Sequence, residues 1–367
     1  MASSHIAPPV ASDRAASPTA TRAATTATAS RARHPAVAHK RRQLLLIGLI
    51  TLAIITCASI AIGARSVPLN TVLDALLDRP VSELDAHAVL DSRLPRTAAG
   101  LLVGCALGMA GAVMQGVARN PLADPGILGI SAGSAFAVTL GIGLLNWHTP
   151  SHYTWLAMLG AALATGLVLV IGTRGAGRAD PVRTLLTGVA LSAVLQGFTT
   201  ALRLANPRTF NETLVWQAGT LEGRGWAPLL AALPFLAVGV AIAALISGPL
   251  NGIALGDDAA GGLGIQVGAV RLWAALAVTL LAGGAVAICG PIAFIGLMAP
   301  HLIRNLIGPD QRWILGLCAL WAPIILLTAD ILGRFILPSG EMPVSVVAAF
   351  VGAPVLIAVV RRKGALS

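Results

Sequence analysis

The residues of this chain that could do chemistry are few and far apart. His301 could ligate a metal, but no second ligand lies three or four residues away, where one helix face would present both. His148 and His152 are four residues apart, yet Pro150 lies between them and argues against a shared helical face. The sequence therefore predicts no metal site.

One carboxylate, Asp330, lies inside an apolar run, where an acid could serve a proton relay. Arg334 follows one helical turn later and favours a structural ion pair instead. The cysteines form no closely spaced pair and are interpreted as small buried hydrophobic residues: Cys57, Cys105, Cys289 and Cys318. Nothing here predicts a catalytic centre.

Other polar residues interrupt the apolar sequence abruptly. The stretch "RNPLADP" occupies residues 119–125, between two apolar runs. Pro121 and Pro125 cannot continue a helix, and each pushes the preceding residue out of the α region. We therefore expect a tight, extended turn at this point of the chain.

The composition indicates the elements that must position these residues. Hydrophobic residues make up 56% of the 367 residues and charged residues only 11%, whereas a soluble domain carries roughly 25% charged residues. A membrane-spanning helix needs about 20 apolar residues. Ten such runs are present, which predicts an all-α polytopic membrane protein of about ten transmembrane helices: 44–64, 97–117, 126–145, 153–172, 184–202, 227–247, 270–289, 292–307, 313–333 and 344–360.

The eighth run is short and follows Gly290-Pro291, so a re-entrant or tilted half-helix is an alternative to a full span. An even number of spans places both termini on one side. Basic residues precede the first span at 40–42 and follow the last at 361–363, which predicts that both termini are cytoplasmic. The net charge of +10 thus has an explanation in topology, and nucleic-acid binding is disfavoured.

The first 39 residues differ in kind from the rest. They are rich in Ala, Thr, Ser, Pro and Arg, with Asp13 as the only acid. Such a composition cannot bury a core, so we expect a disordered cytoplasmic tail before a membrane domain at 40–367, although the stretch also resembles a transit peptide. No phosphate-binding loop for ATP is present, so the chain is not expected to hydrolyse ATP itself.

Small residues recur every fourth position in the second run, at Gly100, Gly104 and Gly108, followed by Gly111. This spacing allows helix backbones to approach closely. We interpret it as packing within the chain, with a dimer contact as the alternative.

Several long motifs, in order, resemble the permeases of type II ABC importers for iron-siderophores, haem and cobalamin, the FecCD family. They begin with "RLPRTAAGLLVGCALGMAGAVMQGVARNPLADPGILGISAG" at residues 93–133. They continue with "LVWQAGTLEGRGW", "LNGIALGDDAAGGLGI", "GPIAFIGLMAPHLIRNLIGPDQR", "ADILGRFILPSGEMPVSVV" and "GAPVLIAVVRR". The resemblance covers residues 44–363, all but the tail.

The resemblance implies a ten-span permease that works as a pair with a second copy or a paralogue. Two separate ATPase subunits bind its cytoplasmic side and supply ATP and magnesium chemistry, so no cofactor is expected in this chain. A periplasmic or lipoprotein substrate-binding protein delivers the substrate. The resemblance also implies docking of two glutamates of that protein onto Arg93, Arg96 and Arg334, for which interfacial anchoring or an Asp330–Arg334 pair is the alternative.

The resemblance implies two further sites on the cytoplasmic side. Asn120 and Leu122 correspond to an inner gate, with a rigid turn as the plain structural alternative. The segment that couples to the ATPase corresponds to Gly256, Asp257, Asp258, Ala259 and Gly264, although two adjacent acids could equally belong to a solvated loop. Residues expected on the fifth and tenth spans near the pathway are Thr184, Thr187, Ser192, Gln196, Ser345 and Gly352.

The function expected is therefore import of a ferric siderophore across the bacterial cytoplasmic membrane, with haem or cobalamin as alternative substrates. A different class of function, an ion-coupled secondary transporter acting alone, would need an unpaired carboxylate inside a span. Asp330 is the only acid placed inside one of the ten runs.

Overall fold

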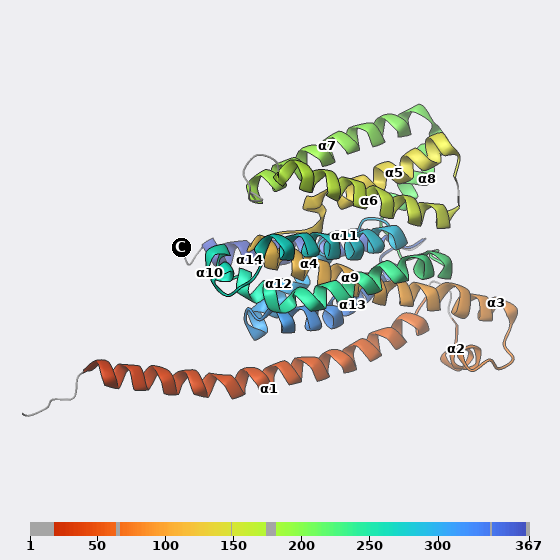
Figure 1. Cartoon of the computed structure of the whole chain (residues 1–367). Helices are drawn as coiled ribbons and strands as arrows, with labels where there is room; N and C mark the ends of the chain where they lie inside the picture. The colour runs from red at the N-terminus through yellow and green to blue at the C-terminus, as the bar shows by residue number, and fades with distance from the viewer. Residues whose placement is uncertain (1–17, 64–66, 148, 174–180, 338–339, 365–367) are drawn as a thin grey trace, which may run out of the picture. The chain divides into compact units, whose positions relative to one another are not determined.

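The computed structural model describes residues 18–63, 67–147, 149–173, 181–337 and 340–364, and these residues form helices with no strand among them (Figure 1). The long helices are α1 (Pro18–Ala61), α4 (Leu94–Ala118), α5 (Ile130–Leu145), α6 (Pro150–Thr173), α7 (Pro181–Ala205), α9 (Trp226–Ile253), α11 (Val267–Cys289), α12 (Ile295–Ile307), α13 (Gln311–Ile336) and α14 (Val344–Gly364). Short elements join them: α2 (Leu69–Leu76), α3 (Glu83–Ala86), the π-helix η1 (His87–Arg93), the 3-10 helix η2 (Pro125–Leu128), α8 (Pro207–Gln217) and α10 (Asp257–Gly262).

Each of the ten apolar runs falls on one of these long helices, which confirms the all-helical membrane class. Within the described residues, seven helices are long and apolar enough to cross a membrane, and α5 and the start of α14 are shorter apolar helices. The eighth run corresponds to α12, which has 13 residues and is therefore about 20 Å long. The number of complete crossings stays a prediction.

Contact density divides the chain into residues 1–43 and residues 44–367. The division falls four residues after the end of the tail expected from composition. The first unit contains the beginning of α1, which is helical from Pro18. That residues 1–39 form a disordered cytoplasmic tail stays a prediction.

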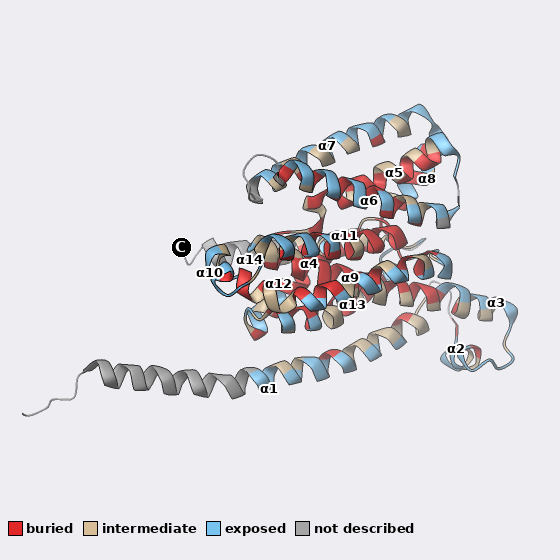
Figure 2. Ribbon diagram, in the orientation of Figure 1, coloured by how far each residue is buried: buried red, intermediate tan, exposed pale blue. Residues whose placement is uncertain are grey.

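Helix α4 is the centre of the second unit, and it packs against α13, α11, α12 and α9. Figure 2 shows α4 and α11 largely buried, and the main core cluster draws its side chains from these helices. The neighbouring helices approach α4 closely because glycine has no side chain. A Cβ at Gly104 would lie 2.5 Å from Pro323 Cα, and one at Gly111 would lie 1.7 Å from the carbonyl oxygen of Gly296. The small residues of α4 therefore pack within the chain.

Helices α5, α6, α7 and α8 form a second group, in which α6 also packs against α11. The contact between α5 and α6 is close because Gly133 and Gly160 face each other's backbones. By contrast, α7 exposes most of its apolar side chains: Leu185, Leu186, Val189, Val194 and Phe198. Such a face requires lipid or another protein to cover it.

Local signals explain where several helices begin. Asn206 caps α8 by accepting hydrogen bonds from the Arg208 and Thr209 amides, and Pro207 occupies the first helical position. Asp310 caps α13 through the Arg312 amide.

The cysteines are unpaired in the structure. Cys57 is exposed on α1, so its predicted burial is wrong. The reason is that α1 presents most of its surface outward.

Candidate functional site

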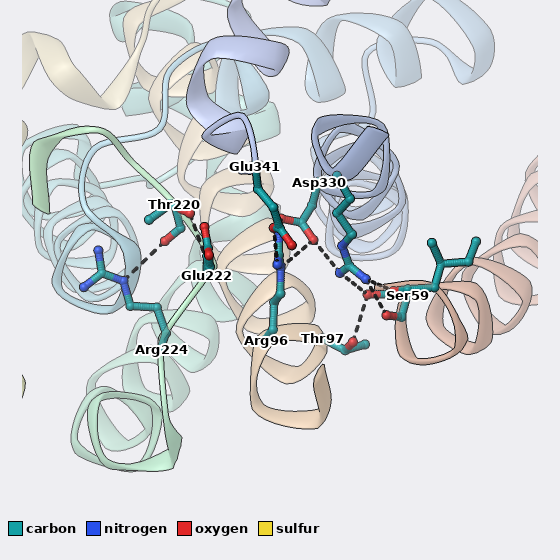
Figure 3. A network of polar contacts seen from close by, with 10 residues as sticks. Ser59, Arg96, Thr97, Thr220, Glu222, Arg224, Asp330 and Glu341 are labelled. Atoms are coloured by element: carbon teal, nitrogen blue, oxygen red, sulfur yellow. Dashed lines mark hydrogen bonds and ion pairs between the residues drawn. The ribbon is translucent and has the colours of Figure 1, made fainter. Parts of the chain in front are cut away.

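The end of the bundle where α4 begins holds a cluster of buried charges (Figure 3). Arg96, in the first turn of α4, donates from Nε and Nη2 to the Asp330 carboxylate, at 3.0 Å to Oδ2 and 2.8 Å to Oδ1. Its Nη1 lies 2.5 Å from Oε2 of Glu341, in the connection between α13 and α14. One guanidinium thus holds two carboxylates from different elements, a geometry suited to its planar fork.

Arg334 completes the cluster from the last turn of α13. Its Nη2 lies 2.6 Å from Asp330 Oδ2, which is the ion pair expected from their spacing. It also donates to the Ser59 carbonyl at 2.7 Å and to the carbonyl of Ile62, both near the end of α1. The Ser59 hydroxyl in turn bonds Thr97 at 2.8 Å. The charges therefore tie α1, α4 and α13 together.

Arg93 lies one turn before Arg96 and contacts α1 as well. Its Nη1 donates to the carbonyls of Ile60 and Ala61 at 3.1 and 2.8 Å. Arg93, Arg96 and Arg334 are brought together as expected, but they are 5%, 7% and 6% exposed and hold partners within the chain. Docking of another protein onto them stays a prediction, because it would require some of these contacts to exchange.

Sequence reasoning missed two members of this cluster, Glu341 and Ser59. Glu341 lies in a short stretch of Gly, Met and Pro without helical periodicity, so nothing indicated where its carboxylate would point. Ser59 is one of three hydroxyl residues in the apolar part of α1, and such residues usually bond their own helix. Burying four charges costs desolvation energy that their pairing offsets only when every partner is present.

At the other end of α4, residues 119–129 form the tight turn expected from the two prolines. Arg119 ends α4 in the left-handed conformation, with φ of 50°. The Asn120 side chain accepts a hydrogen bond from the Leu122 amide at 2.9 Å, and Asp124 accepts one from the Gly126 amide at 2.7 Å. Burial raises the pKa of Asp124, whereas its bond to the Gly126 amide opposes that shift. Asn120 therefore stabilises the turn itself, and its side chain is committed locally.

The third apolar run was expected to be helical from residue 126. Residues 125–128 instead form η2, and α5 begins at Ile130, because Asp124 and Pro125 start a separate 3-10 turn. Leu122 is 42% exposed at the tip of the turn. An exposed leucine at this position is compatible with a gate but does not identify one.

Helix α10 carries the proposed ATPase-coupling residues and contacts this turn. Asp257 lies 3.3 Å from Nη2 of Arg119 and 3.0 Å from Nη2 of Arg271, at the start of α11.

The other residues of this segment differ in exposure. Asp258 and Ala259 are exposed, while Ala260 is buried against the core. Gly256 and Gly264 bound the segment with positive φ angles of 112° and 79°. The ion pair between Arg271 and Asp257 was not expected, because no sequence pattern indicates that the start of α11 contacts the coupling segment.

A cavity of about 260 Å³ lies beneath the turn. Asn120, Ala123 and Ile127 line it from the turn, and Arg271 lines it from α11. The remaining wall is mostly apolar and comes from α4, α6, α7 and α11. The turn is therefore not packed on all sides.

The described residues contain no group of three or more His, Cys, Asp or Glu that could hold a metal ion. His301 is buried in α12 and its Nε2 lies 2.9 Å from the Asn305 amide nitrogen, one turn away. His148 lies outside the residues that the structure describes.

Comparison with known proteins identifies the family. The model of the FecCD transport family matches residues 51–362. The chain belongs to the FecCD transport family. Members are permease subunits of ABC importers whose ATPase is a separate subunit, so this chain is a transport subunit and not an enzyme.

Curated FecCD relatives are similar over most of their length. The chain is 49% identical over 315 residues to the ferric enterobactin transport system permease protein FepD of Escherichia coli (strain K12), covering 86% of this chain and 94% of the relative. It is 36% identical over 307 residues to the probable siderophore transport system permease protein YfiZ of Bacillus subtilis (strain 168), covering 83% and 92%. Identity to the hemin transport system permease protein HmuU of Yersinia pestis is also 36%, covering 86% and 94%.

A solved FecCD-like structure supports the fold. A metal-chelate type ABC transporter in an inward-facing conformation matches with a TM-score of 0.75 and 25% identity, covering 88% of this chain and 99% of that chain. The chain therefore shares the fold of that solved chain.

Proposed function

We propose that this chain translocates a ferric siderophore into the bacterial cytoplasm, driven by a separate ATPase subunit. The observation that carries the substrate class is the 49% identity to the ferric enterobactin permease over 94% of that protein. Haem is the second candidate, since the hemin permease matches at 36% over a similar length. Cobalamin stays a third candidate on the family resemblance alone.

The partners proposed are two ATPase subunits, a substrate-binding protein and a second permease, either a copy or a paralogue. The exposed apolar face of α7 supports contact with a second permease or lipid, because most of the large apolar side chains that the structure describes on this helix are exposed. Both termini are proposed to be cytoplasmic, with the membrane domain at 40–367 and a cytoplasmic tail at 1–39.

Docking of the binding protein is proposed at the outer end, around Arg93, Arg96 and Arg334. Glutamates of the binding protein would approach the positively charged guanidinium groups. The complementary charges would then fix the position in which the two proteins dock. Asn120 and Leu122 are proposed as the inner gate, and Gly256, Asp257, Asp258, Ala259 and Gly264 as the ATPase contact.

The ion-coupled transporter has little support. It needs a carboxylate free to exchange protons, and Asp330 is 1% exposed between Arg96 and Arg334. Both of its oxygen atoms accept hydrogen bonds from these arginines. Asp330 is therefore assigned a structural role.

Uptake of radiolabelled chelates tests the function. Cells that lack this permease, grown in low iron, are offered ferric enterobactin, haem and cobalamin in parallel, with and without the restored gene. We expect restored uptake of the ferric siderophore alone. Restored uptake of haem or cobalamin would change the assigned substrate to that compound. Restored uptake that is insensitive to vanadate and proceeds without an ATPase subunit would contradict the assignment as an ABC importer.

A further inference from the structure

The cytoplasmic turn and helix α10 are joined by one carboxylate. Asp257, in the first turn of α10, faces Arg119 at the end of α4 and Arg271 at the start of α11. Its side chain is 31% exposed, and the Arg271 side chain is 18% exposed. The consecutive helices α10 and α11 therefore meet the end of α4, which is distant in sequence, at a single acidic group.

The contact can transmit movement because the turn on its other side is stiff. Asn120 and Asp124 each close a local hydrogen-bonded loop, and Pro121 and Pro125 restrict the backbone between them. Arg119 immediately precedes this turn. A shift of Asp257 would therefore displace residues 120–125 together or break its two ion pairs.

The turn also has room to move. Asn120, Ala123 and Ile127 border the cavity of about 260 Å³, and Arg271 borders it from the opposite side. Close-packed interiors switch between discrete arrangements and do not deform gradually, so a void beside a stiff turn is where a second arrangement fits.

We propose that the Arg119–Asp257–Arg271 triad is the contact through which α10 moves the gate turn, and that the cavity receives the turn. Arg119 and Arg271 are then positioning residues for transport, acting through the turn and not on the substrate. This inference rests on the proposed function, since it assumes that α10 contacts an ATPase.

The test uses the intact complex of the chain with the ATPase subunit that co-purifies with it. Arg119→Gln and Arg271→Gln each remove one arginine charge that faces Asp257, with little change in size. We expect both variants to retain the ATPase subunit and its rate of hydrolysis, while chelate uptake falls about tenfold, within the range typical of coupling between sites. Arg119→Lys and Arg271→Lys should retain most of the uptake.

The double variant decides whether the two residues act as one unit. If they do, Arg119→Gln with Arg271→Gln lowers uptake no further than the more severe single change. Losses that multiply, to about a hundredfold, would overturn the triad, because independent sites are additive in free energy. Loss of the ATPase subunit in Arg119→Gln would also overturn it, since Arg119 would then be a docking residue.

Matched controls separate the triad from general effects of charge and volume. Asp74 and Arg79 form an exposed pair at 3.2 Å outside both proposed sites, and neutralising both should leave uptake unchanged. Ala275→Leu, which fills the cavity from α11, should lower uptake without lowering the melting temperature. Ala53→Leu on the exposed face of α1 is its control.

Two further results have separate meanings. Wild-type uptake in Ala275→Leu would overturn the part of the proposal that assigns the cavity. A wild-type chain that retains no ATPase subunit and imports no chelate would contradict the proposed function itself, before any variant is compared.

Discussion

Asp330 holds together the end of the bundle where α4 begins, through its two arginine neighbours. Its carboxylate meets Arg96 from α4 and Arg334 from its own helix, while Glu341 meets Arg96 from the far side. Removing one member of such a set leaves a buried charge without compensation, which costs more than the set contributes as a whole. Removal of any one member should therefore lower the stability of the protein by more than the energy of its own contacts.

Replacing Asp330 with asparagine should destabilise the protein strongly. The change keeps the shape but removes the charge facing Arg334, so we expect a loss of about 3–5 kcal/mol in the free energy of unfolding. Thermal melting of the detergent-purified chain measures this. Asp74→Asn, in an exposed pair, should cost no more than about 1 kcal/mol. Equal effects in the two variants would show that the buried cluster is not structural.

At the scale of helices, the closest contact depends on a glycine in the middle of α4. A Cβ at position 111 would lie 1.7 Å from the Gly296 carbonyl oxygen in α12, and 2.4 Å from the carbonyl carbon. Both neighbours belong to backbone, so no side-chain rotation can relieve the overlap. Separation of α4 from α12 is the only way to accommodate a methyl group.

Gly111→Ala should therefore destabilise the protein by about 1–3 kcal/mol, the usual cost of overpacking. Gly166 in α6 is its control, because nothing lies within 4 Å of a Cβ built there. Gly166→Ala should be neutral or stabilise by up to about 1 kcal/mol, since alanine loses less backbone entropy in a helix. The two melting temperatures should move apart. A shift of the same sign and size in both would mean that α4 and α12 do not pack this closely.

The helices were predictable because each is a long apolar run, but some of their ends were not. Residues 83–93 carry Glu83, Asp85 and Asp91 and look like an outer loop, yet α3 and η1 lead directly into α4. Burial of Arg93 and Val89 against the end of α1 explains this, and no local pattern encodes that contact. Likewise, the role of Asp257 in coupling stays a prediction, and its contact with Arg119 was not predictable because the approach of α4 to α10 depends on the packing of the bundle.

At the scale of the whole molecule, the family and the all-helical class followed from motifs and composition, while orientation in the membrane stays open to direct measurement. Cysteine labelling in whole cells provides it. With the native cysteines replaced, Glu83→Cys before α4 should react with an impermeant reagent added outside. Gly262→Cys in α10 should react only after the membrane is permeabilised, because positive-inside topology places that loop in the cytoplasm. The opposite pattern would reverse both termini.

The charge cluster described at the start of α4 has an electrical consequence. Arg96 and Arg334 carry two positive charges, and Asp330 and Glu341 carry two negative ones, so these four side chains sum to zero. Moving one unit charge through a membrane potential of 100 mV changes the energy by about 2.3 kcal/mol, whereas a neutral group moved as a unit does no such work. These four side chains can therefore shift together during a transport cycle at no cost that depends on the voltage across the membrane, whereas Arg93, the fifth buried charge at this end, would add such a cost.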